Sequence, residues 1–150
     1  MPPREPSLRE RALRFLAARE HSRAELQRKL APHAESAEAL DILLDELTAA
    51  KQLSDARFAE ARSHLLSRKY GASRIAHDLR SKGVSDEEAQ AAMATARATD
   101  LERAREVYRR KFRTAPSSRE ERARHMRFLQ SRGFSFDVIK AVMQGTPEEE

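Results

Sequence analysis

The chain offers few side chains that could catalyse a reaction or hold a metal ion. It has no cysteine, so thiolate nucleophiles, thiolate metal sites and disulfides are excluded. Its four glycines stand alone, so no glycine-rich run could cradle a phosphate. The histidines do not follow metal-ligand spacing, and the four-residue separation of His21 and Glu25 is common on charged helices. We therefore predict no enzyme, no metal site and no cofactor.

Positive charge is the chemical feature that stands out. The chain has a net charge of +5, and residues 103–127 hold ten basic residues but three acidic ones. On a helix at 100–113, apolar residues fall on one side, and Arg103, Arg109, Arg110 and Arg113 project from the opposite side. Such a concentration indicates an anionic partner, either DNA phosphate or an acidic protein groove. The alternative is a solvated face that serves solubility alone.

Two aromatic residues stand out when the chain is compared with itself, because residues 129–143 repeat the pattern of residues 79–93, fifty positions earlier. At this offset, Phe128 corresponds to Asp78, and Phe136 corresponds to Asp86. Each is either a local packing change or an exposed anchor, and packing is favoured for Phe136 alone. An aromatic residue beside arginine, as at Phe128, is typical of interface hot spots. The predicted partner-binding residues are Arg68, Lys69, Arg74, Arg103, Arg109, Arg110, Arg113, Arg122, Arg124, Arg127, Phe128 and Arg132.

The composition indicates an ordered, all-α protein with a thin core. Apolar residues make up 39% of the chain and charged residues 35%. Alanine and leucine greatly outnumber valine and isoleucine, which favours helix over strand. No apolar run approaches the roughly 20 residues that a membrane span needs, and the N-terminus has no apolar targeting segment. A soluble, cytoplasmic protein is expected.

Serine and glycine signals divide the chain into helices. Ser22, Ser85 and Ser118 each precede a glutamate by three residues, the pattern of a capping box. Gly83 and Gly133 stand where a helix should end in a residue with positive φ. No helix breaker separates the sixth and seventh helices, so these two could form one bent helix. The predicted helices are 7–19, 22–31, 36–50, 54–69, 72–82, 85–98, 100–113, 118–132 and 135–144.

An internal repeat groups these helices in threes. Residues 79–93 and 129–143 are identical at six of fifteen aligned positions. A repeat of this period indicates a supersecondary unit used more than once, and stacked units offer an extended surface to a large partner. We predict repeats at 7–50, 54–98 and 100–144, with a disordered tail at 1–6 and an acidic, disordered tail at 145–150.

Three segments resemble the RecX family, the small regulators of the bacterial recombinase RecA. They are HSRAELQRKLA at 21–31, SDARFAEAR with RKYGASRIAHDLRSKGVSD within 54–86, and RARHMRFLQSRGFSFDVIKAVM at 122–143. The resemblance implies three tandem three-helix repeats in a curved, elongated solenoid. It also implies a monomer that binds the groove of a RecA filament on DNA and inhibits the ATPase, strand exchange and coprotease activity of RecA, acting in recombination, DNA repair and the SOS response.

The residues themselves leave two alternatives open. One is a free-standing nucleic-acid-binding module whose arginines contact phosphate directly. The other is a generic helical scaffold for a different protein. Binding to RecA filaments without affinity for free DNA would separate the RecX-like function from the first alternative, and binding to neither would leave the second.

Overall fold

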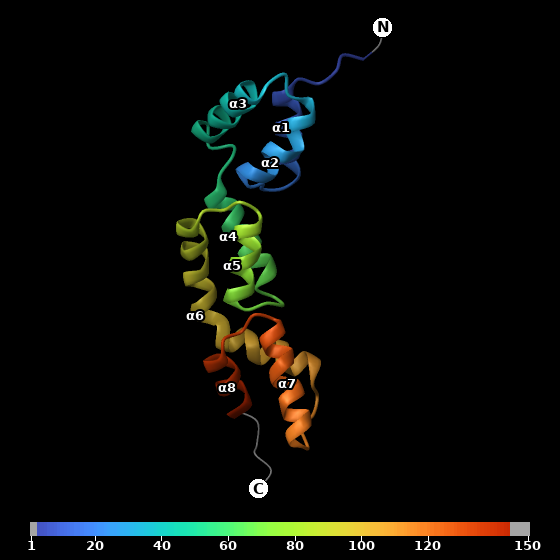
Figure 1. Ribbon diagram of the computed structural model, residues 1–150, viewed down its shortest axis with the longest axis vertical. Helices are drawn as coiled ribbons and strands as arrows, with labels where there is room; N and C mark the ends of the chain where they lie inside the picture. Colours follow the sequence, from blue (N-terminus) through green and yellow to red (C-terminus); the bar gives the residue numbers. More distant parts are fainter. Residues whose placement is uncertain (1–2, 145–150) are drawn as a thin grey trace.

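The computed structural model describes residues 3–144, and every regular element within that range is a helix. The helices stack along one long axis in a gently curved, elongated molecule, with the two chain ends far apart (Figure 1). This confirms the predicted all-α solenoid. The elements are α1 (Leu8–Ala18), α2 (Arg23–Leu30), the short 3₁₀ helix η1 (Ala31–His33), α3 (Ala37–Ala49), α4 (Asp55–Leu66), α5 (Ala72–Ser81), α6 (Asp86–Lys111), α7 (Arg119–Ser131) and α8 (Phe136–Gln144).

The predicted tails fall at the edges of this range. Residues 3–6 precede α1 without regular secondary structure, and Arg4 forms an ion pair with Glu10 at 2.6 Å. The predicted acidic tail at 145–150 lies outside the described residues. Among residues 3–144, no helix combines the length and the apolar composition that crossing a bilayer requires.

Serine side chains begin most helices at the predicted positions. Oγ of Ser22 accepts a hydrogen bond from the N–H of Glu25, and the Glu25 carboxylate accepts one from the N–H of Ser22, both at 3.1 Å. This capping box is complete and fixes the start of α2. The boxes predicted for α6 and α7 are half formed, because each serine accepts the expected N–H but the glutamate carboxylate does not bond back to it.

Helix α6 replaces two of the predicted helices. The segments 85–98 and 100–113 form one helix of 26 residues, as the missing helix breaker allowed. Its first half packs against α4 and α5, and it then changes direction and packs against α8 (Figure 1). Because one helix serves two three-helix units, the predicted boundary at 98–100 falls inside a continuous element.

Each three-helix unit has its own hydrophobic core. The first core is built mainly from leucines, including Leu26, Leu44 and Leu47. The second is rich in alanine, which lets α4, α5 and α6 approach closely. The third contains larger residues, such as Ile139 and Val142, at positions that correspond to Ala89 and Ala92 of the second unit.

The two junctions between units are formed by hydrogen bonds at equivalent positions of the repeat. The Ser22 hydroxyl at the start of α2 donates to the carbonyl of Lys82 at 2.6 Å. In the next junction, the N–H of Gly71 at the start of α5 donates to the carbonyl of Arg132 at 2.7 Å. In both cases the turn between the second and third helices of one unit lies on the start of the second helix of the preceding unit. The repeated contact sets a regular stacking of the units.

The glycines in these turns explain the close approach. Gly83 and Gly133 have φ angles of 83° and 90°, which confirms the predicted helix stops. A Cβ atom on Gly133 would lie 2.4 Å from Cβ of Arg74 and 2.8 Å from its backbone nitrogen. Glycine is therefore needed at this turn for two reasons: its conformation and the space left by the neighbouring unit.

Replacing Gly133 with valine should lower the free energy of unfolding by more than about 2 kcal/mol, because backbone strain and overlap with α5 act together. Urea denaturation followed by circular dichroism measures the change. Gln130→Val, an exposed substitution one turn earlier, is the control and should shift stability by about 0.5 kcal/mol. Equal midpoints for the two variants would contradict the packing of this turn.

Candidate partner-binding surface

The end of α6 presents Arg109 and Arg110 to solvent, as predicted. Their side chains are 72% and 65% exposed. Both guanidinium groups lie beside Glu106, at 2.9 and 3.3 Å, and the hydrogen bond from Arg109 is the main reason that the pKa of Glu106 is lowered. A single carboxylate faces two arginines here, so this end of the helix keeps a net positive charge.

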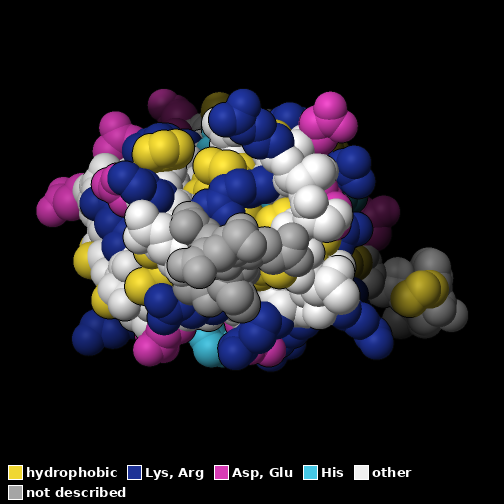
Figure 2. All heavy atoms as spheres, turned by 90° about the horizontal axis from the view of Figure 1, so that it is seen from below, with side chains coloured by type: hydrophobic (Ala, Val, Ile, Leu, Met, Phe, Trp, Pro, Cys, Tyr) yellow, Lys and Arg dark blue, Asp and Glu magenta, His cyan; other side chains and the backbone are white. Residues whose placement is uncertain are grey.

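Most of the other predicted basic residues are also at the surface. Viewed toward the C-terminal end, lysine and arginine side chains occupy much of the outline, with acidic side chains among them (Figure 2). Basic side chains therefore surround this end of the molecule. That these residues contact a partner stays a prediction. Arg68, Lys69, Arg74, Arg113, Arg124 and Arg127 are exposed, whereas Arg122, Phe128 and Arg132 are half-buried.

Arg103 was predicted to project into solvent, and this prediction is wrong. Its side chain is 16% exposed and forms an ion pair with Asp100, which is 8% exposed. Its Nη1 atom donates to the backbone carbonyls of Ser67 and Tyr70, at 2.9 and 2.5 Å, and Nη2 donates to the carbonyl of Ala96 at 2.9 Å. Arg103 therefore holds the loop between α4 and α5 against α6 and is unavailable to a partner.

Asp100 completes this buried cluster from the other side. Its Oδ2 atom accepts the N–H of Ala72 at 3.3 Å, at the start of α5. Gly71, the residue before α5, has no side chain that could cap the helix, so Asp100 supplies the missing acceptor from α6. Burial raises the pKa of Asp100, partly offset by Arg103 and by the Ala72 N–H.

A row of alternating cationic and aromatic side chains crosses the junction between the second and third units. The guanidinium carbon of Arg74 lies 4.3 Å from the centre of the Tyr70 ring. Arg132 lies 5.5 Å from the same ring and 5.1 Å from the ring of Phe128. Lys111 lies 5.7 Å from Phe128 on the other side. We call these five residues the cation–aromatic row, and cation–π attraction stabilises their arrangement.

The two aromatic residues singled out by the repeat comparison have different outcomes. Phe128 is half-buried and meets the ring of Phe112 edge-on at 5.4 Å, so the packing interpretation holds for part of its surface. Phe136 is 67% exposed, and its predicted packing role is wrong. Phe134, which is 3% exposed, occupies the core instead, because the turn after α7 directs that side chain inward.

The histidines include two buried ones, and both have structural partners. Nδ1 of His125 and the Tyr108 hydroxyl form a hydrogen bond of 2.8 Å, and Phe112 stacks on the imidazole ring at 3.7 Å. His21 contacts the carbonyl of Arg19 and Nζ of Lys29, at 3.1 and 2.8 Å. Within residues 3–144, no three His, Cys, Asp or Glu side chains are grouped so that they could hold a metal ion.

Stability should fall as the pH decreases below about 6.5, the usual pKa of histidine. Burial lowers the pKa of His125, although Glu121 opposes the shift, and burial also lowers the pKa of His21. The unfolded chain therefore binds more protons between the folded-state pKa and 6.5, and stability rises with pH in that window. His125→Asn should flatten the dependence of melting temperature on pH between 5.5 and 7.5. His33→Asn, a substitution of an exposed histidine, is the control and should keep the pH dependence of the wild type. If the plots of melting temperature against pH are parallel for His125→Asn and the wild type, His125 is not a buried, neutral imidazole.

Sequence reasoning missed two members of the cation–aromatic row. Tyr70 and Lys111 were both outside the predicted partner-binding set. The available signal was the cluster of basic residues around the Tyr70–Gly71 turn, which places cations beside an aromatic ring. What the sequence could not show is that α6 and α7 bring Lys111 and Phe128 to the same junction.

Comparisons with known proteins agree with the three-unit architecture. Models of the first, second and third three-helix domains of RecX match residues 9–47, 54–93 and 98–143. A protein named regulatory protein RecX from Leptothrix cholodnii is 48% identical over 138 residues, covering 92% of this chain and 88% of that protein. A protein of the same name from Ralstonia nicotianae is 43% identical over 144 residues, covering 95% and 91%. The crystal structure of RecX from Lactobacillus salivarius superposes with a TM-score of 0.81 at 20% identity, covering 92% of this chain and 93% of that one.

Proposed function

This chain belongs to the RecX family, and we propose that it is a non-enzymatic regulator that binds the RecA filament on DNA in the cytoplasm. As a monomer, it would inhibit the ATPase, strand exchange and coprotease activity of RecA. The observation that supports this proposal most strongly is the match of all three family domains, in order, across the described chain.

The shape of the molecule supports docking on a filament. Three units stacked end to end present a long surface, and a filament of repeated subunits presents a long groove (Figure 1). Contacts spread along such a surface can engage more than one subunit at once, which raises the effective affinity without requiring any strong single contact. The regular junctions at Lys82 and Arg132 hold the units at a fixed spacing for this purpose.

The charge of the third unit supports an anionic partner surface. Arg109 and Arg110 are exposed, and several further arginines of α7 share that end of the molecule. Positive charge of this kind steers association with acidic protein surfaces or DNA phosphates and makes it depend on salt. The same arginines favour a second candidate function, direct binding to free nucleic acid.

Binding measurements separate the two functions. The fluorescently labelled protein is titrated with RecA filaments on single-stranded DNA, and separately with the same DNA alone. We expect saturable binding to the filament and weak, salt-sensitive binding to the bare DNA. Equal affinity for both would favour the nucleic-acid-binding module, and binding to neither would contradict both functions.

A further inference from the structure

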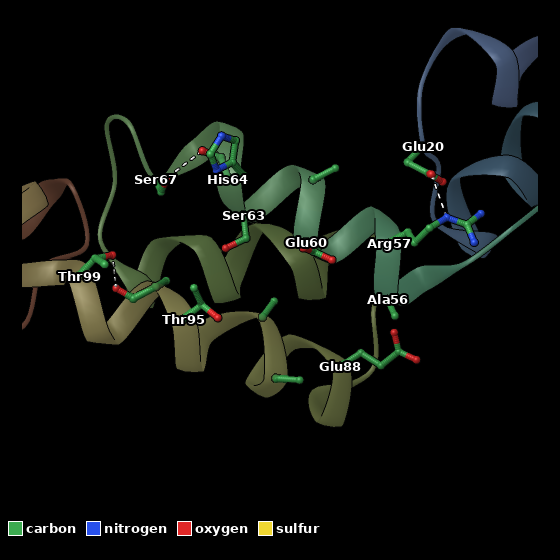
Figure 3. Close-up of a pocket in the computed structure, with 14 residues that line it drawn as sticks. Glu20, Ala56, Arg57, Glu60, Ser63, His64, Ser67, Glu88, Thr95 and Thr99 are labelled. Carbon is green, nitrogen blue, oxygen red and sulfur yellow. Dashed lines mark hydrogen bonds and ion pairs between the residues drawn. The ribbon is translucent and has the colours of Figure 1, made fainter.

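A groove of about 890 Å³ runs between α4 and α6 on the second unit. Small side chains line most of it, so the two helices are not covered by bulky residues there (Figure 3). Small polar groups are added along its length by Thr95 and Thr99 from α6, by Ser63 from α4 and by Ser67, the residue that follows α4. The alanines of the groove are Ala56, Ala61, Ala91, Ala92 and Ala96.

The dimensions of the groove suit an α-helix. Helix α4 has 12 residues, which at 1.5 Å per residue gives a length of about 18 Å, or roughly three helical turns. Small side chains allow a third helix to approach near the lower end of the usual interaxial distance of about 8–10 Å. A duplex of DNA is too wide for such a groove, and the acidic residues described next would repel its phosphates.

One end of the groove carries negative charge that the protein itself does not neutralise. Arg57 pairs with Glu20 at 2.9 Å, so these two charges compensate each other. Glu60 and Glu88 lie at the same end of the groove, one on α4 and one on α6 (Figure 3). Among the ion pairs of residues 3–144, none involves Glu60 or Glu88.

Glu88 is the more informative of the two. Its backbone N–H bonds to Oγ of Ser85 at 3.2 Å, as in a capping box, but its carboxylate turns toward Ala56 on α4. Its Oε2 atom is buried and has no hydrogen-bond partner among the described residues. A carboxylate held away from its usual capping partner and left without a cation is costly for the free protein. Glu88 as a whole is half-buried, so a lysine or arginine supplied from outside would pair with the accessible part of this carboxylate and reduce that cost.

We propose that this groove binds an α-helix of the regulated partner protein. That helix would place small apolar side chains against the alanines and a lysine or arginine beside Glu60 and Glu88. The inference rests on the proposed function, because the partner is the filament that the chain regulates. The acidic end of the groove would be a second contact surface, opposite in charge to the basic third unit. Two contact surfaces of opposite charge fix the orientation of the chain on its partner.

Two adjacent residues of α6 provide a matched test. Thr95 and Ala94 are both exposed, but only Thr95 lines the groove. Thr95→Trp would fill the groove with an indole ring, whereas Ala94→Trp would place the same ring beside it. Binding of each variant to RecA filaments on single-stranded DNA is measured by fluorescence anisotropy, after circular dichroism has shown that both are folded. We expect Thr95→Trp to weaken binding about tenfold or more, as for a central interface position, and Ala94→Trp to bind like the wild type.

A charge variant tests the second half of the proposal. Glu88→Gln keeps the shape of the side chain and removes its charge, so it should weaken filament binding and reduce its salt dependence while leaving folding intact. Wild-type binding by both Thr95→Trp and Glu88→Gln would overturn the groove assignment and leave the proposed function standing. Failure of the wild type to bind the filament would overturn both. Self-association of the wild type that Thr95→Trp abolishes, seen in analytical ultracentrifugation, would assign the groove to a second copy of the chain and overturn the proposal.

Discussion

Replacing Arg103 with methionine is expected to lower the free energy of unfolding by about 3–5 kcal/mol, the usual cost of removing one partner of a buried ion pair. The change leaves the Asp100 carboxylate buried without its cation and removes the donor for three backbone carbonyls. The methionine side chain preserves much of the volume, so the loss is electrostatic. Urea denaturation at pH 7.5 gives the measurement.

A second substitution identifies the cause of this loss. Burial already raises the pKa of Asp100 in the wild type, and removing Arg103 should raise it further. Asp100→Asn in the Arg103→Met background removes the buried charge and keeps an oxygen that can accept the Ala72 N–H. The double variant should therefore be more stable than Arg103→Met alone. Arg105→Met, an exposed substitution in the same helix, is the control and should change stability by less than about 0.5 kcal/mol. If Arg103→Met is as stable as Arg105→Met, the buried cluster does not hold the loop.

Reversing Arg109 and Arg110 to glutamate is expected to weaken inhibition of RecA about tenfold or more, because attraction at the partner surface becomes repulsion. The effect should grow as the salt concentration falls, since screening weakens. Three neighbouring glutamates, including Glu106, would then lie at the end of α6, which costs a few tenths of a kcal/mol per like-charged pair. The variant should stay folded, and its melting curve checks this.

Net charge must be controlled in this experiment. Each reversal changes the charge by two units, so the double variant has a net charge of +1 instead of +5. Arg14→Glu with Arg28→Glu makes the same change on exposed residues of the first unit. This control should inhibit RecA nearly as well as the wild type. Equal defects in the two double variants would mean that net charge, and not the third unit, governs the interaction.

Local signals in the sequence were sufficient for most of the fold. Serine caps and glycine stops act through hydrogen bonds and φ angles within a few residues, so Ser22, Gly83 and Gly133 could be interpreted without the rest of the chain. The internal repeat then grouped the helices, since equivalent units bury equivalent faces. What it could not show is that these same glycines also form the junctions between units, because that contact joins residues more than fifty positions apart.

The candidate site was harder to predict, and Arg103 shows why. A helical wheel for residues 100–113 predicts a single buried side, and this prediction would be correct if the helix packed within one unit only. Helix α6 belongs to two units, so a second side is buried where the loop between α4 and α5 lies against it. Arg103 falls on that second side, whereas Arg109 and Arg110 lie beyond it and are exposed.

The groove between α4 and α6 had no sequence signal at all. It exists because small side chains from two helices fall side by side, and alanine at an exposed position is ordinary in a helix. Glu88 was interpreted as half of a capping box, a local pattern that competes with the groove for the same carboxylate. Only the packing of α4 against α6 decides between these two environments.

The most direct test of the proposed function is the rate of ATP hydrolysis by RecA on single-stranded DNA as this protein is titrated in. We expect the rate to fall with increasing protein and to reach a plateau, and we expect the Arg109→Glu and Arg110→Glu double variant to require a much higher concentration for the same inhibition. An unchanged rate at saturating concentrations of folded wild-type protein would contradict the proposal that this chain regulates the RecA filament.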